Sequence, residues 1–117
     1  NAIDYTKYSF DGKSRLSKKD LGYNIVMKYI NEHSDKTFAE LQSDLAFDDT
    51  VDNKYRYKGV LARTEEITGS YTPCFGAEQI SSEGVKYKVL TWWNKYNIDF
   101  IIKFAKAQGW AVNTVTE

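Results

Sequence analysis

The sequence is poor in cysteine and proline and carries no net charge, and each of these scarcities excludes a class of protein. Its single cysteine excludes a disulfide framework and a cysteine-based zinc site. One proline and seven glycines among 117 residues do not fit a low-complexity linker, and 42% hydrophobic residues do not fit a disordered chain. The apolar runs are only a few residues long, so neither a transmembrane helix nor a membrane partner is expected. Sixteen basic residues balance sixteen acidic ones, which removes the simple electrostatic argument for nucleic acid.

A length of 117 residues suits a single globular domain, which we expect to be soluble and cytoplasmic. The chain starts with Asn1 instead of methionine, which indicates a processed chain or a fragment of a longer protein. Residues 1–10 lack the apolar segment of a secretory signal. We expect one domain over residues 1–117, in which residues 1–15 form an extended N-terminal segment.

The clearest local signal is a helix start at Ser17. The Ser17 hydroxyl can accept hydrogen bonds from free backbone N–H groups of the first turn, and Asp20 can act as the acidic half of a capping box. The apolar residues that follow share one helical face: Leu21, Ile25, Val26, Tyr29 and Ile30. The sequence therefore predicts a helix over residues 18–31.

A second helix start follows at Thr37, with Glu40 placed to complete its capping box. This helix is expected to end near Ala46, before an acidic loop over residues 47–53 that is too polar to enter the core. Two capped helices joined by a short polar link resemble the first half of a helix-turn-helix.

The second half of the chain combines strand signals with turn signals. Residues 59–62 form a short apolar run typical of a strand. Thr64 is expected to cap a short helix that Gly69 ends, and residues 71–76 are expected to be irregular. Residues 79–92, with a turn at Ser81 to Gly84, predict a β-hairpin whose second arm alternates apolar and basic side chains.

A final helix is predicted after Asn94 or Asn97. Gly109 has the position of a left-handed residue that ends this helix, and residues 111–115 can add a last strand. The fold class is therefore α+β: a single domain with helices packed on a small antiparallel sheet, for which a winged-helix-like arrangement is one candidate. The residues expected to share its core are Leu21, Ile25, Tyr29, Phe38, Leu41, Val89, Ile98, Ile101 and Ile102.

The sequence offers little support for an enzyme. His33, the only histidine, lies near the end of the first helix, where a histidine is usually placed against the helix dipole. Cys74 has no second cysteine beside it and is expected to be a small hydrophobic residue or an incidental thiol. No phosphate loop, dinucleotide fingerprint or nucleophile motif is present, and the acidic residues match no metal-binding spacing. We expect no catalytic residue, no cofactor and no metal.

The neutral total charge hides a segregation that favours binding. Residues 31–52 are strongly acidic, whereas residues 53–63 and 84–110 are mainly basic, and cations alternate with aromatic rings in residues 54–58. Such a run can pair its cations with phosphates while its rings stack on bases or sugars. The structural alternative is a strand with one basic exposed face and one tyrosine face packed inward. The candidate nucleic-acid contacts are Lys54, Tyr55, Arg56, Tyr57, Lys58, Arg63, Lys86 and Lys88.

Two adjacent tryptophans, Trp92 and Trp93, follow the predicted hairpin. If the strand continues that far, one ring points into the core and the other points outward. The outward ring either covers the edge of the domain or belongs to a binding surface.

Several short motifs together resemble a small bacterial domain found in uncharacterised proteins and in nuclease- or restriction-associated proteins. The matching pieces are LSKKDL at 16–21, TFAEL at 37–41, GV at 59–60, WN at 93–94, NIDFI at 97–101 and AKAQG at 105–109. This chain has Trp92 before Trp93, where the pattern has glutamine. The resemblance covers nearly the whole chain from Leu16 and carries no catalytic residue. It implies an accessory or DNA-recognition module.

The leading hypothesis is a non-catalytic nucleic-acid-binding module, a DNA-recognition part of a DNA-processing or restriction and defence system. The alternative is a protein–protein interaction domain that uses its exposed aromatic residues, with the acidic residues 31–52 as a complementary face. Binding of a small ligand among the tyrosines and tryptophans stays open.

Overall fold

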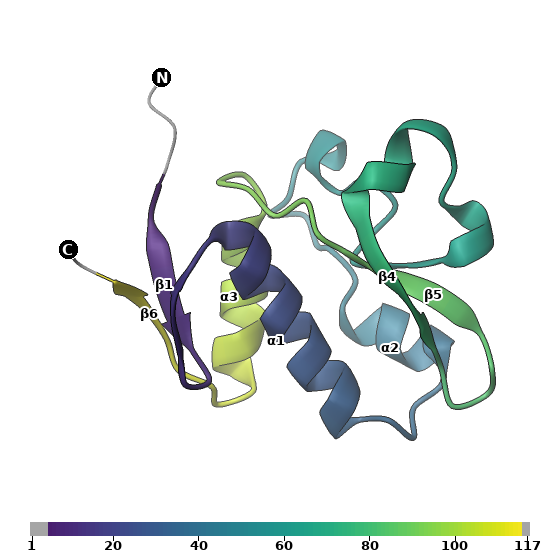
Figure 1. The fold of residues 1–117 in the computed structure, drawn as a ribbon, viewed down its shortest axis with the longest axis horizontal. Helices are drawn as coiled ribbons and strands as arrows, with labels where there is room; N and C mark the ends of the chain where they lie inside the picture. The colour runs from purple at the N-terminus through teal and green to yellow at the C-terminus, as the bar shows by residue number, and fades with distance from the viewer. Residues whose placement is uncertain (1–4, 116–117) are drawn as a thin grey trace.

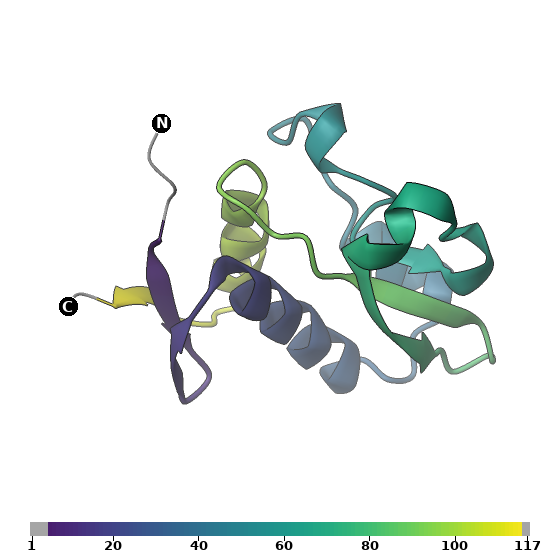
Figure 2. The same cartoon turned by 45° about the horizontal axis from the view of Figure 1, so that its top comes forward.

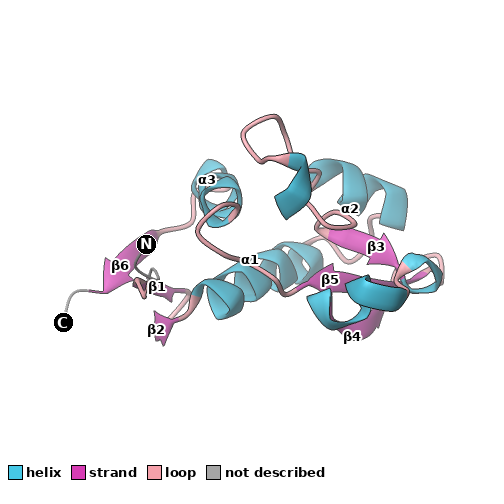
Figure 3. Ribbon diagram, turned by 90° about the horizontal axis from the view of Figure 1, so that it is seen from above, coloured by secondary structure: helices cyan, strands magenta, loops and turns pink. Residues whose placement is uncertain are grey.

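Three blocks follow one another along the long axis of the protein, whose principal extents are 43 × 31 × 25 Å. A computed structural model describes residues 5–115 and places a small sheet at one end, two helices in the middle and a second sheet at the other end (Figures 1 and 3). The helices are α1 (Lys18–Glu32), α2 (Phe38–Asp44) and α3 (Ile98–Ala107). The strands are β1 (Lys7–Phe10), β2 (Lys13–Leu16), β3 (Leu61–Arg63), β4 (Phe75–Ile80), β5 (Lys86–Leu90) and β6 (Val112–Val115). The fold is α+β in one domain, as the sequence predicts.

Both predicted helix starts are confirmed, but of the capping box predicted for Ser17 and Asp20 only the Ser17 half is present. The Ser17 hydroxyl accepts from the Asp20 backbone N–H at 3.2 Å. Thr37 and Glu40 form a complete capping box, in which each side chain accepts from the backbone N–H of the other residue. The predicted inward face of α1 is buried, because its apolar residues recur once per turn against α3, β1 and β5.

The end of α3 also follows the sequence. Gly109 has φ +86°, a conformation that glycine adopts without strain. The Gly109 N–H donates to the Lys106 carbonyl and the Trp110 N–H donates to the Ala105 carbonyl, which is the Schellman pattern. Of the nine residues expected in the core, eight are buried; the exception is Ile102, which is only half-buried at the edge of the helix face.

The structure contains two three-stranded antiparallel sheets, not one. The first has the order β2-β1-β6, and the second has the order β3-β5-β4. The predicted β4–β5 hairpin and the last strand, β6, are both present. However, β6 pairs with β1 near the N-terminus, in the segment 1–15 for which only an extended conformation is expected. Residues 1–4 of that segment lie outside the described residues.

Several local expectations between the helices and the hairpin are wrong. Thr64 does not cap a helix: it is the first residue of the 3₁₀ turn Thr64–Glu66, and its buried hydroxyl has no hydrogen-bond partner within residues 5–115. The segment around Pro73 is not irregular but forms the 3₁₀ helix Gly69–Cys74. The loop 47–53 is not wholly outside the core, because Val51 is buried.

The turn between β4 and β5 is anchored on α2. The Glu83 carboxylate accepts from the Phe38 backbone N–H and from the Ser81 hydroxyl. These hydrogen bonds stabilise the ionised form and lower the pKa of Glu83, the Ser81 bond being the larger cause. The hairpin is thereby fixed to the start of the second helix.

The helix in the recognition position of a helix-turn-helix would be α2, but its composition does not suit a DNA groove. Its seven residues, FAELQSD, include no lysine or arginine, and its one amide side chain, Gln42, donates to the Leu61 carbonyl at 3.1 Å. Recognition helices contact phosphates and bases with cationic or amide side chains. Among residues 5–115, furthermore, no helix is both long enough and apolar enough to cross a bilayer.

Candidate nucleic-acid interface

The segment 53–58 is a tight turn, not a strand. Residues Asn53–Tyr55 form a 3₁₀ turn that Asp52 caps through a hydrogen bond from the Lys54 N–H. Tyr57 then has φ +52° and reverses the chain direction. The alternation of cations and tyrosines at 54–58 therefore does not sort these side chains onto two faces of a sheet, and the structural alternative considered from the sequence is wrong.

Asn97 joins this turn to the loop that follows β5. Its side chain is completely buried. The side-chain oxygen accepts from the Asn94 N–H at 2.7 Å, and the side-chain nitrogen donates to the carbonyls of Tyr55 (3.1 Å) and Trp92 (3.2 Å). Asn97 occupies the cap position of α3 without capping it, because its amide is used to hold the two segments together.

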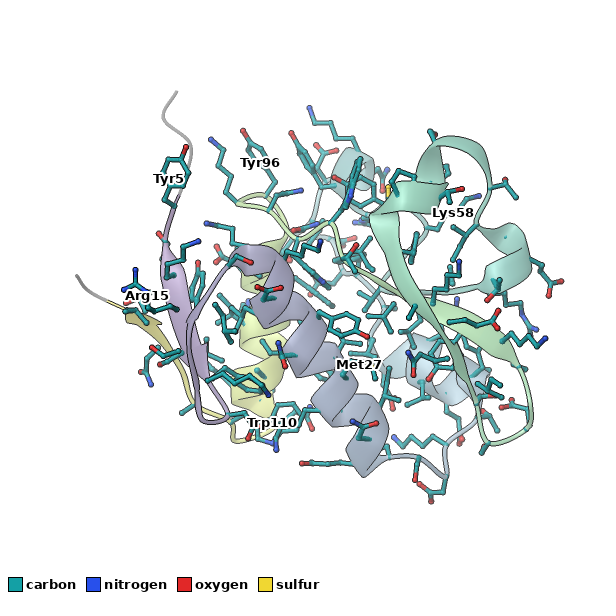
Figure 4. The ribbon with its side chains drawn as sticks, in the orientation of Figure 1. Tyr5, Arg15, Met27, Lys58, Tyr96 and Trp110 are labelled. Atoms are coloured by element: carbon teal, nitrogen blue, oxygen red, sulfur yellow. The ribbon has the colours of Figure 1, made fainter. Side chains whose placement is uncertain are left out.

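These two segments bring four aromatic rings together, and we call Tyr55, Tyr57, Trp92 and Tyr96 the aromatic surface. The rings of Tyr55 and Tyr96 are stacked, with centroids 4.4 Å apart and planes at 15°. The rings of Tyr57 and Trp92 meet edge to face at 5.6 Å and 89°. Tyr96 is 52% exposed and Trp92 is 44% exposed. Tyr96 points away from the body of the protein at the upper edge of Figure 4.

The adjacent tryptophans divide as expected, one inward and one outward. Trp93 is buried, donates from its ring nitrogen to the Leu90 carbonyl at 3.0 Å, and lies against Gly22 of α1. A Cβ at Gly22 would come within 2.3 Å of the Trp93 ring, so only glycine allows this contact. Trp93 thus fixes the loop to the core, while Trp92 stays at the surface.

Two lysines lie beside rings of the aromatic surface, and a third, Lys58, lies over Tyr71 outside it. The Lys54 Nζ atom lies 5.4 Å from the Tyr55 ring centroid, and the Lys95 Nζ atom lies 5.1 Å from that of Tyr96. The Lys58 Nζ atom lies 5.0 Å from the Tyr71 ring centroid, and Figure 4 shows Lys58 well apart from Tyr96. None of the three lysines forms an ion pair with a residue in the range 5–115. Their charges are therefore not neutralised by a carboxylate of this part of the chain.

Two of the predicted contacts serve the fold. The Arg56 guanidinium donates to the carbonyls of Val51 (2.7 Å) and Asp48 (2.8 Å), and so holds the preceding loop. The Arg63 guanidinium lies 5.3 Å from the Phe38 ring centroid. Both arginines are half-buried.

The predicted lysines of β5 belong to a different face from Arg63. Arg63 pairs with Tyr87 in the sheet, while Ala62 pairs with Lys88, and directly paired residues point to the same face. Lys86 and Lys88 alternate with Tyr87 and so lie on the opposite face. The predicted set therefore does not form one cluster: Lys54, Tyr55 and Tyr57 belong to the aromatic surface and its border, Lys58 lies over Tyr71, and Arg63, Lys86 and Lys88 lie on the second sheet.

Burial affects the chemistry of two groups beside the aromatic surface. Burial raises the pKa of the Tyr57 hydroxyl, and the hydrogen bond that it accepts from Asn94 opposes this effect. Burial also raises the pKa of the Cys74 thiol, which makes it less reactive. The surface is therefore aromatic and cationic, with no titration of these two groups near neutral pH.

Sequence reasoning missed Tyr96, Lys95 and the role of Asn97. The signal available was the run of aromatic and basic residues at 92–96. Tyr55 lies 41 positions before Tyr96 in the sequence, and only the tertiary structure brings the two rings together. Figure 2 shows the two segments as neighbouring loops at the top of the protein.

No family model, curated protein or solved structure matches this chain. Within the part of the chain that the structure describes, no three histidine, cysteine or acidic side chains are grouped so that they could hold a metal ion. Function is therefore inferred from the geometry above.

Proposed function

We propose that this protein is a non-catalytic nucleic-acid-binding module that uses the aromatic surface and its lysines. The observation that carries the proposal is the stacked Tyr55–Tyr96 pair with Lys54 and Lys95 beside its rings. Aromatic rings combined with cations form the usual contact surface of proteins that bind nucleic-acid strands. A cytoplasmic role in a DNA-processing or restriction system is the part of the proposal that comes from the motif resemblance.

The exposure of the rings supports a binding role. The large hydrophobic residues exposed within 5–115 are Tyr5, Ile80, Trp92 and Tyr96. Two of these four lie on one short loop, and that loop is held rigidly by Asn97 and Trp93. Rings that are fixed in place before binding lose little conformational freedom when a ligand arrives.

The test is a titration with single-stranded and duplex oligonucleotides at several salt concentrations. If Lys54 and Lys95 each contact one phosphate, the slope of log affinity against log salt is about −1.4 for a single strand and about −1.8 for a duplex. Replacing Lys54 and Lys95 together by alanine removes both contacts, so it should bring the slope close to zero for either ligand.

The matched control is the double variant Lys13→Ala/Lys106→Ala, which changes the net charge equally at the start of β2 and in the last turn of α3, outside the aromatic surface. It should leave the slope unchanged. Absence of binding to either oligonucleotide at low salt would refute the proposal, as would an equal loss of affinity in the control.

A protein partner is the second candidate, and the exposed Trp92 ring is the observation that favours it. The acidic residues 31–52 add little support, because several of them already stabilise the fold. Glu40 completes a capping box, Asp44 binds Lys36, and Asp52 caps a 3₁₀ turn. This candidate predicts binding that depends on Trp92 and barely on salt.

A further inference from the structure

We infer that the ligand is an unpaired nucleic-acid strand, one of whose bases stacks on Tyr96 as the next layer of the Tyr55–Tyr96 stack. This inference rests on the proposed function and names the class of nucleic acid that the aromatic surface takes. It is argued from the arrangement of the rings, from their rigidity and from the position of the cations.

The Tyr55–Tyr96 pair has the geometry of two stacked bases. A centroid distance of 4.4 Å and an angle of 15° between the planes leave the two rings nearly parallel. Tyr55 is half-buried and covers one face of the Tyr96 ring, while Tyr96 remains 52% exposed. The stack thus ends at the surface of the protein, on the ring that is the more exposed of the two.

Stacking on such a ring requires a base whose own face is free. In a duplex each base is covered above and below by its neighbours, so a protein ring can reach a base face only at an end or after local opening. Bases of an unpaired strand can be splayed out and stacked on aromatic side chains, and every base offers such a face. The stack therefore favours a single strand and gives no advantage with an intact duplex.

Each ring of the stack has a lysine that can take a phosphate next to the stacked base. The Lys95 Nζ atom lies 5.1 Å from the Tyr96 ring centroid, and the Lys54 Nζ atom lies 5.4 Å from that of Tyr55. Both side chains are flexible and can leave their own rings to contact a backbone phosphate. Trp92, held edge to face by Tyr57, offers a second exposed ring for a neighbouring base.

Asn97 acts as a positioning residue for this site. Its buried amide holds the backbone carbonyls of Tyr55 and Trp92 on the two segments that carry the rings. The stack is therefore already formed in the free protein, and a base adds to it without ordering the loops.

The experiment compares three 12-nucleotide ligands with the same number of phosphates per strand: a single strand, its duplex, and an abasic strand that keeps only sugar and phosphate. Each is titrated against the unmodified protein, Tyr96→Ala and Tyr96→Phe. DNA and RNA versions of the single strand form separate arms, since the stacking chemistry is common to both. Circular dichroism confirms that the variants are folded, which the exposure of Tyr96 leads us to expect.

The single strand should bind more tightly than the duplex and the abasic strand. Tyr96→Ala should weaken single-strand binding by about 5- to 150-fold, the range for the loss of one stacked base, while Tyr96→Phe keeps the ring and should change it little. Tyr96→Ala should leave the affinity for the abasic strand and for the duplex unchanged. Trp92→Ala serves as a second variant and should also act only on the ligand with unpaired bases.

The outcomes separate this inference from the proposed function. Salt-dependent binding in which the duplex is preferred, or in which Tyr96→Ala affects the abasic strand as much as the single strand, would overturn the inference and leave a nucleic-acid-binding module. No binding of any of the three ligands would overturn both.

Discussion

Two regions of this protein place a lysine beside a tyrosine, and only one of them neutralises the lysine. In the first, Lys36 lies 5.6 Å from the Tyr29 ring centroid but binds the Asp44 carboxylate at 2.6 Å. We call Tyr29, His33, Lys36 and Asp44 the Tyr29 cluster. In the second, the aromatic surface, Lys54 and Lys95 have no carboxylate partner within residues 5–115. A lysine that is neutralised by a carboxylate stabilises the fold, whereas a lysine without such a partner is free to bind the phosphate of a ligand.

The ionisation of the Tyr29 cluster supports its structural role. The Tyr29 hydroxyl donates to Asp44 at 2.7 Å, and its ring stacks on His33 and meets Phe104 edge to face. The hydrogen bond from Lys36 is the main cause that lowers the pKa of Asp44, and the bond to Asp44 raises the pKa of Lys36. Burial is the main cause that raises the pKa of the Tyr29 hydroxyl. At neutral pH Lys36 is therefore charged, Asp44 is ionised and the Tyr29 hydroxyl is neutral.

The largest loss of stability is expected in α3, the helix that lies between the two regions. Ile101 of α3 is completely buried; α3 starts directly after Asn97 and carries Phe104 against Tyr29. Ile101→Ala should lower the free energy of unfolding by about 2–5 kcal/mol, the usual cost of truncating a core isoleucine. Urea denaturation measures this loss, and Lys103→Ala on the exposed side of α3 is the control, expected within about 0.5 kcal/mol of the unmodified protein. A near-neutral Ile101→Ala variant would contradict the packing of α3.

A smaller effect should appear when the Tyr29 cluster loses its charge. Asp44→Asn removes the ion pair with Lys36, and we expect a loss of about 1–2 kcal/mol at neutral pH, since the pair is partly screened by solvent. Because folding lowers the pKa of Asp44, its stabilising contribution is complete above pH about 4 and is lost as the pH falls through the lowered value. The difference between the two proteins should therefore shrink in acid, as measured by thermal unfolding from pH 2 to 7. A difference independent of pH would show that Asp44 is not held ionised by Lys36.

The smallest effects are expected at the helix starts that carry the Tyr29 cluster. Ser17→Ala at α1 and Thr37→Ala at α2 should each lower stability by about 1 kcal/mol, because each removes one acceptor from the first turn. Affinity for nucleic acid, measured on the folded protein, should not change. A loss of affinity in either variant would show that the two regions are coupled, and the comparison between them would then fail.

The parts of the fold that the sequence predicts well are those with local signals. The cap at Ser17, the capping box of Thr37 and the Schellman end at Gly109 depend on residues three to five positions apart, and all are present. The β4–β5 hairpin is also predicted, because its turn and its alternation lie in one continuous segment.

The parts that the sequence does not predict depend on distant partners. The pairing of β1 with β6 joins segments from the two ends of the chain. The sequence pattern of either strand does not indicate which other strand it pairs with. Residues 54–58 have the right composition for a binding surface, but the sequence does not show that Arg56 is used to hold the loop at Val51. Nor does it show that Tyr96 completes the stack, since that contact depends on the buried amide of Asn97.

The pairing of β1 with β6 has a consequence for how this fold connects to other sequences. Lys7 pairs directly with Val115 in neighbouring antiparallel strands. The chain therefore enters and leaves the fold side by side, roughly 5 Å apart between paired Cα atoms. A fold with this connectivity would fit into a surface loop of a host protein without separating the two ends of that loop.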